Sequence, residues 1–347
     1  MSNLYIIGAG CSRNYSSDQN IITDLSPPLN EDFFKMAKLV LAKTGMRYDE
    51  NFMEDINALL KKLSKLYGLD SNLSMLDSEK LNLEDVMTIL DVDYKMFSSL
   101  YININKNQSS PHLKLLIDLL VRTLDYALKG DCCRKHNKIV QKMKKNDLIL
   151  NYNYDMLFDI PLLNSKKFTH EGYKINFYRT YNKGEWNKIK ESPSNITMLK
   201  LHGSVNWIRC DICGSILNLG HDKVDGLFGY IPFTCPKCKS NDSHTSRMII
   251  PPLQVKDYSD KDIAYLWLKA DSMLSDIDNI TIIGYSFSPS DYASTSLYRR
   301  YASNRNIEPS ICLVSPTNRL VDRISDLFNV SPEVISQYSF DDYLETL

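Results

Sequence analysis

The feature that most limits how this chain can fold is a set of four cysteines in two closely spaced pairs. Cys210 and Cys213 form one C-x2-C pair, and Cys235 and Cys238 form the second after a 21-residue spacer. Each two-residue gap allows a tight turn to direct both sulfurs at one point, and four thiolates complete the tetrahedron that zinc prefers. We therefore predict a structural Zn2+ site within residues 208–248. Chance spacing or disulfide pairing is the alternative.

Size and charge limit the class of protein. The chain has 347 residues, of which 43% are hydrophobic, enough for a large core with insertions. Lys plus Arg total 41 and Asp plus Glu total 42, so no overall basic field indicates nucleic acid or an anionic membrane as a partner. The first residues lack a basic, apolar leader, and no apolar run approaches the roughly 20 residues of a membrane helix. We expect a cytoplasmic protein with no membrane partner.

Apolar periodicity separates a helical segment from an α/β remainder. Asn82 and Asp85 are spaced as a helix-capping pair. Apolar residues recur every three to four positions in five stretches, which predicts helices at residues 31–43, 52–68, 83–101, 112–130 and 132–145. Short β-rich runs occur on both sides of this segment, at residues 3–10, 147–153, 175–178, 196–201, 279–286 and 311–316.

The alternation of strand runs with helical or polar segments is typical of a parallel sheet with helices on both faces. We predict an α/β, Rossmann-like fold in which residues 1–28 and 146–347 form the Rossmann domain. Residues 29–145 would form a large all-helical insertion, and residues 208–248 a small four-cysteine zinc ribbon. Ligands of such sheets bind at the carboxyl ends of the strands. Here those ends are rich in glycine and small polar residues, reading GAGCS, NYNYD, LHGS, GYSFSPSD and SPTN.

Two of these strand ends contain candidate binding residues. Gly8 and Gly10 permit a tight turn and close approach to a phosphate, and a turn without a ligand is the alternative. Arg13 replaces the third glycine of the dinucleotide pattern G-x-G-x-x-G, which disfavours a hydride-transfer enzyme. Asn153 and Asp155 follow a buried strand, where they line a crevice or form an Asx-rich strand exit.

His202 ends another strand run and precedes a glycine, ahead of the first cysteine pair. Because four sulfurs already complete a zinc tetrahedron, the metal needs no further ligand. We therefore expect His202 to face the crevice at the carboxyl end of its strand. A purely structural histidine is the alternative.

The order of these motifs resembles the sirtuin family, whose members cleave NAD and hold zinc on a small ribbon beside the dinucleotide fold. The resemblance rests on GAGCSR, NYNYD, LHGS, the paired cysteines, GYS and VSP, which occur in this order. It covers residues 3–15 and about 147–318, with the helical segment as an insertion.

The resemblance implies roles for individual residues. His202 would be the general base, acting through the ribose hydroxyls, and Asn153 would be a second catalytic residue near the nicotinamide ribose. The residues implied to bind NAD+ are Gly8, Ala9, Gly10, Ser12, Arg13, Asn153, Asp155, Gly284, Tyr285, Ser286 and Ser315.

Two motifs of the protein deacylases are missing, namely G-I-P-x-F-R after the glycine loop and F-G-E after the cysteines. PPLNEDFF, NLEDVMTIL, LHGSVNW and IIGYSFSPSD instead resemble divergent bacterial sirtuin-like domains that hydrolyse NAD, often in anti-phage defence. This resemblance implies an NAD+ glycohydrolase that releases nicotinamide and ADP-ribose. Its activity would be gated by a homo-oligomer or by a protein partner such as a defence-system ATPase or sensor. NAD-dependent deacylation, ADP-ribosyl transfer and non-catalytic binding of NAD or ADP-ribose are the alternatives.

Overall fold

The computed structural model describes residues 2–14, 25–44, 50–69, 76, 81–98, 110–128, 133–182, 184–190, 192–220, 234–241, 244–275 and 277–347. The chain forms two compact units. The larger unit comprises Met1–Ile22, Gly130–Ile250 and Asp257–Leu347, and the smaller comprises Thr23–Lys129 and Pro251–Lys256. In the described part of the chain, no helix combines the length and the apolar character needed to cross a membrane.

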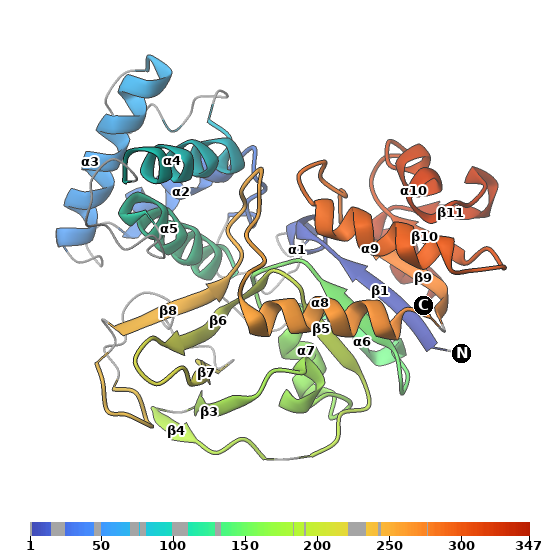
Figure 1. Cartoon of the computed structure of the whole chain (residues 1–347). Helices are drawn as coiled ribbons and strands as arrows, with labels where there is room; N and C mark the ends of the chain where they lie inside the picture. Colours follow the sequence, from blue (N-terminus) through green and yellow to red (C-terminus); the bar gives the residue numbers. More distant parts are fainter. Residues whose placement is uncertain are drawn as a thin grey trace. The chain divides into compact units, whose positions relative to one another are not determined.

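The larger unit is built on a six-stranded sheet in which every pairing is parallel (Figure 1). In sheet order its strands are β11 (Ile335–Tyr338), β10 (Ser310–Val314), β9 (Ile277–Ile283), β1 (Ser2–Ile7), β2 (Leu148–Asn151) and β5 (Thr197–Lys200). The chain moves outward from β1 to β2 and β5, and then returns to the other side of β1 for β9, β10 and β11. The switch point between β1 and β9 is where sheets of this order bind ligands. The predicted Rossmann-like sheet is confirmed.

Helices accompany this sheet because its strands are apolar on both faces. Leu4, Ile6, Ile149 and Leu150 are almost completely buried, as expected of central parallel strands. The helical segments of this unit are α1 (Ala9–Arg13), α6 (Arg134–Lys142), α7 (Asp159–Asn164), η4 (His170–Tyr173), α8 (Lys261–Met273), α9 (Tyr292–Ser303), α10 (Val321–Phe328), η6 (Pro332–Val334) and α11 (Phe340–Thr346).

A second, mixed sheet carries the four cysteines. Its order is β4 (Glu185–Asn187), β3 (Phe177–Asn182), β7 (Ile216–Asn218), β6 (Gly203–Cys210) and β8 (Thr245–Ile249). Trp207 of β6 is fully buried, with its ring 5.4 Å from the rings of both Tyr173 and Phe177. Residues 177–178 of the predicted strand run at 175–178 belong to β3, so this run contributes to the mixed sheet and not to the parallel one. Phe177 of this run packs on Trp207, a contact that periodicity cannot reveal.

The smaller unit is helical, with α2 (Phe33–Thr44), α3 (Glu50–Tyr67), α4 (Leu83–Ser98) and α5 (Pro111–Ala127). The Asn82 side chain accepts hydrogen bonds from the backbone N–H groups of Glu84 and Asp85, at 2.9 and 3.4 Å, as its sequence position predicted. Helix α6, the last of the five predicted helices, forms but groups with the larger unit.

Candidate functional site

The loops after β1 and β9 interlock through their glycines. The Gly8 N–H donates to the Ile283 carbonyl at 3.0 Å, and the Gly10 N–H donates to the Gly284 carbonyl at 2.9 Å. Gly284 has a φ of +62°, and a Cβ there would lie 2.1 Å from the Cys11 nitrogen. Glycine is thus required here by direct contact between two backbones. That these glycines also approach a phosphate stays a prediction.

Ser12, Asn153 and Asp155 form a buried network beside the glycine loop. Asn153 Nδ2 donates to the Gly8 carbonyl and to Ser12 Oγ, both at 3.0 Å. Ser12 Oγ in turn donates to Asp155 Oδ2 at 2.8 Å. All three side chains are at most 7% exposed. The structure therefore brings together residues of the β1 and β2 loops that the sequence proposed for one site.

The buried ammonium group of Lys200 contacts the backbone of Asp155. Lys200 is fully buried, and its ammonium donates to the Asp155 carbonyl and contacts the Asp159 carboxylate at 3.2 Å. The Tyr173 hydroxyl donates to Asp159 at 2.7 Å, which completes the support. Burial raises the pKa of the Asp155 carboxyl, against the opposing effects of Lys200 and of the hydrogen bonds from Leu157 and Ser12.

His202 lies between β5 and β6 and is 4% exposed. Its Nε2 is 3.5 Å from Asp291 Oδ1, and its ring meets the edge of the Tyr152 ring with centroids 5.2 Å apart. Strands β5 and β9 are separated in the sheet by β1 and β2, so the contact with Asp291 reaches over the carboxyl ends of two strands. His202 thus belongs to the same edge of the sheet as the glycine loop.

Asp291 and Tyr152 are site residues that sequence reasoning missed. The Tyr285 hydroxyl donates to Asp291 Oδ2 at 2.8 Å, and the Tyr285 ring stacks on Tyr152 at 4.0 Å. Burial raises the pKa of both tyrosines well above its usual range, and Asp291 adds to this effect. Both hydroxyls therefore stay protonated donors. The available signals were the aspartate that ends GYSFSPSD and the tyrosine inside NYN.

Other candidates lie farther along the edge. Ala9 and Ser286 are exposed, and Arg13 ends α1. Ser315 follows β10, and its N–H donates to the Tyr338 carbonyl of β11 at 2.9 Å. Gly284 connects the two groups, because its N–H donates to the Val314 carbonyl at 3.2 Å. The ligand-binding roles of these four outer residues stay predictions.

The four cysteines converge as predicted. All four sulfurs lie within 4.8 Å of one another, with Cys210 3.5 Å from Cys238 and Cys213 3.8 Å from Cys235. Four sulfurs that surround a zinc ion at about 2.3 Å are about 3.8 Å apart, so the cluster fits a structural zinc. None of these four cysteines forms a disulfide in the structure. His202 is not part of this cluster.

The neighbours of Cys210 favour a thiolate. Burial raises the pKa of the Cys210 thiol, but hydrogen bonds from Ser240 and from the backbone at Cys213 and Ile212 outweigh this effect and lower it to about 6. A thiolate is the form that binds zinc. A hydrogen bond with Ser215 also lowers the pKa of the Cys213 thiol, whereas burial raises the pKa of the Cys235 thiol to about 11. The surroundings therefore favour a thiolate at Cys210 and Cys213 but not at Cys235.

Comparison with known proteins finds solved structures of low similarity. No family model matches the chain, and no curated protein matches it. A solved Sir2 structure with a bound propionylated peptide aligns over 99% of this chain and 90% of its own, at 10% identity and a TM-score of 0.42. A Sir2 homolog in complex with NAD aligns over 68% and 73%, at 11% identity and a TM-score of 0.37.

Proposed function

We propose that this protein is an NAD+ glycohydrolase that uses His202 as its general base. The observation that carries the proposal is the position of His202, outside the cysteine cluster and against Asp291 at the carboxyl edge of the parallel sheet. The motif order that resembles sirtuins supports the same assignment, and so does the β1–β9 switch point beside the glycine loops.

The reaction makes modest demands on the protein. Nicotinamide is a cationic leaving group on the ribose anomeric carbon, so it departs as a neutral molecule without a general acid. The bond between that carbon and the ring nitrogen breaks, water adds to the oxocarbenium-like carbon, and one proton is released. His202 accepts this proton through a ribose hydroxyl or from the water. Asp291, 3.5 Å from its Nε2, stabilises the imidazolium that forms.

Asn153 and Asp155 have different roles in this scheme. Asn153 Nδ2 already donates to the Gly8 carbonyl and to Ser12 Oγ, so its Oδ1 is the atom that can accept a hydrogen bond from the nicotinamide amide or a ribose hydroxyl without adding charge. Asp155 is occupied by Ser12 Oγ and by the Leu157 N–H, at 2.8 and 2.9 Å. We therefore assign Asp155 to holding the glycine loop and Asn153 in place, rather than to direct charge stabilisation.

The zinc ribbon is assigned a structural role. Zn2+ would be held by Cys210, Cys213, Cys235 and Cys238, which leave no position open for substrate or water. When bound, the ion would supply folding energy to the mixed sheet and no chemistry at His202.

The burial of His202 supports gating. A side chain that is 4% exposed needs movement of its neighbours before a substrate reaches it. Self-association or a protein partner would supply the energy for this movement, and the resemblance to anti-phage proteins suggests an infection-dependent trigger. Nicotinamide release that rises more than linearly with protein concentration, alongside sedimentation analysis, would identify self-association as the gate.

The central test is free nicotinamide release from NAD+ by the wild type, His202→Ala and His244→Ala. His244 is exposed and serves as the matched control. We expect His202→Ala to lose about 100-fold or more of the rate, as for loss of a general base, with unchanged zinc content. His244→Ala should retain both.

The other outcomes separate the alternatives. NAD+ or ADP-ribose binding without nicotinamide release, at every protein concentration and with partner extract, would indicate a binding module. Release that requires an acylated peptide or another acceptor would indicate a deacylase or ADP-ribosyltransferase. Loss of zinc in His202→Ala would return His202 to the metal site.

A further inference from the structure

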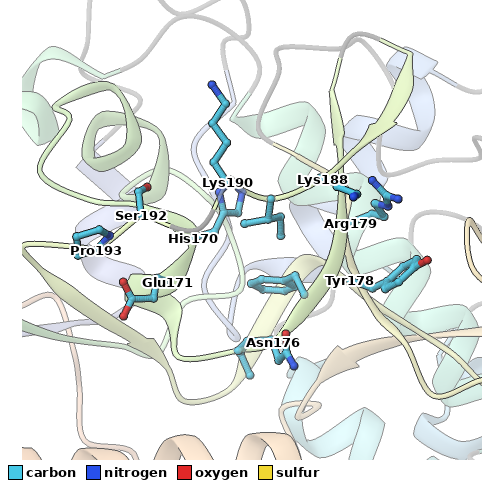
Figure 2. Close-up of a pocket in the computed structure, with 12 residues that line it drawn as sticks. His170, Glu171, Asn176, Tyr178, Arg179, Lys188, Lys190, Ser192 and Pro193 are labelled. Atoms are coloured by element: carbon cyan, nitrogen blue, oxygen red, sulfur yellow. The ribbon is translucent and has the colours of Figure 1, made fainter.

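The larger unit has a second candidate binding site, a hollow of about 980 Å³ lined by residues of η4, β3, 188–190 and 192–193 (Figure 2). A volume of this order suits a ligand of small-molecule size. The hollow shares no lining residue with the edge that carries His202. It therefore calls for a separate explanation.

The charge of the hollow is strongly one-sided. Of the described residues that line it, Arg179, Lys188 and Lys190 are cationic, and Glu171 is the single carboxylate. In Figure 2 Glu171 lies at the left, and Arg179 and Lys188 lie at the right. Glu171 already accepts from the Ser194 N–H at 3.2 Å and pairs with Lys174 at 3.5 Å. It is therefore not the counter-ion of the three cations.

Arg179 differs from other arginines of this unit. Arg209, Arg299, Arg300 and Arg305 each pair with an aspartate. Arg179 instead packs over the Tyr178 ring at 5.4 Å, and among described residues no carboxylate pairs with Arg179, Lys188 or Lys190. Three cations around one hollow, in a chain of net charge -1, indicate a ligand with several negative charges.

The floor of the hollow is apolar. Ile175 and Phe177 are buried and Ile189 is partly buried, so they offer a surface for a flat ring but no further charge. Burial lowers the pKa of His170, so this imidazole is neutral near pH 7 and provides a hydrogen bond instead of a fourth charge. A flat apolar group joined to a multiply charged anion is the chemistry of a nucleotide.

We propose that this hollow binds a nucleotide, with the phosphates on Arg179, Lys188 and Lys190 and the base over Ile175 and Phe177. Each of these surface cations contributes little by itself, but together they act on a polyphosphate. Lysine supplies point charges, and arginine supplies a planar donor pair. An acidic peptide would satisfy the cations but would leave the apolar floor without a matching group.

The test measures ATP binding to the full chain by titration calorimetry, and charge-reversal variants at the hollow and elsewhere distinguish binding at the hollow from binding at the proposed NAD site. Lys188→Glu combined with Lys190→Glu should raise the Kd for ATP about tenfold or more, because attraction becomes repulsion. Lys144→Glu combined with Lys145→Glu reverses the same charge at two exposed positions elsewhere in the unit and should leave the Kd within about twofold. Arg179→Gln should weaken ATP without reversing charge.

Each part of the proposal can fail separately. Equal affinity for ATP and inorganic tripolyphosphate would overturn the base site, and tighter binding of poly-glutamate would replace the nucleotide with an acidic peptide. Lack of saturable ATP binding, or equal loss in both double variants, would overturn the site itself. Because ATP binding is measured apart from nicotinamide release, failure of the glycohydrolase proposal leaves this result intact.

Discussion

The cysteine cluster and the carboxyl edge of the parallel sheet achieve order in different ways. Four sulfurs within 4.8 Å of one another contribute little attraction themselves, and the zinc ion that we propose for this cluster would hold them together. The edge needs no ion, because its glycines allow backbones to touch and Ser12 joins Asn153 to Asp155 at 3.0 and 2.8 Å. A metal site is stabilised by one ion and is lost with it, whereas the edge of the sheet is stabilised by several separate backbone and side-chain contacts.

The largest expected effect is loss of the metal. Cys213→Ser should abolish zinc binding and remove a large part of the roughly 10 kcal/mol that a structural zinc supplies. The mixed sheet should lose protection from hydrogen exchange, while β1, β2 and β9 keep theirs. Cys312→Ser, outside the cluster, is the control. Equal loss of protection in both sheets would show that the two regions are not separate.

The next effect tests backbone contact at the edge. Gly284→Ala places a Cβ 2.1 Å from the Cys11 nitrogen at a positive φ, and we expect about 3 kcal/mol of destabilisation in urea unfolding. Gly214, in the cysteine cluster, also has a positive φ of +68° but nothing within 4 Å of an added Cβ. Gly214→Ala should cost only the strain of about 1 kcal/mol. Similar losses of unfolding free energy in Gly284→Ala and Gly214→Ala would refute the role of the contact between Gly284 and Cys11.

A smaller effect tests the hydrogen-bond network. Ser12→Ala leaves a carboxylate oxygen and an amide N–H without the Ser12 hydroxyl, which should cost about 1–3 kcal/mol. Ser303→Ala removes a hydroxyl that bonds only its own helix on the surface and should be nearly neutral. Zinc content should be normal in both variants. A reduced zinc content in Ser12→Ala would mean that the stability of the cysteine cluster depends on the hydrogen-bond network at the carboxyl edge of the parallel sheet.

The most subtle effect is a pH dependence. Burial raises the pKa of Asp155 in the folded protein, so ionisation costs stability. The contribution of Asp155 is most favourable below its unfolded-state pKa and is lost as the pH rises through the folded-state pKa. Asp155→Asn should therefore gain stability relative to the wild type between pH 4 and pH 7. Urea midpoints at the two pH values measure this, and a relative loss would mean that Lys200 outweighs burial.

Much of the fold could be predicted from the sequence. Apolar periodicity identified α2 to α6, and the strand runs identified β1, β2, β5, β9 and β10. Strand β11 was missed because Ile335–Tyr338 is short and only its first residue is buried. The run at residues 175–178 could not be assigned to a sheet from the sequence, because a strand pattern does not specify its neighbour.

The candidate site, too, was predicted only in part from the sequence. The convergence of the four cysteines was predicted from spacing alone, since a C-x2-C turn determines its own geometry within four residues. Asp291 and Tyr152 were not identified, because their contacts with His202 join residues 89 and 50 positions apart. The sequence around Asp291 and around Tyr152 contains no pattern that predicts a contact with His202.

The sequence by itself determined the elements and the cysteine pairs, because both depend on interactions between near neighbours in the chain. Only the tertiary structure decided that the loops after β1, β2, β5 and β9 meet at one edge, with Gly284 against Cys11 and His202 against Asp291. The physical reason is that such contacts follow from strand order and loop packing, which are set by burial of the whole core.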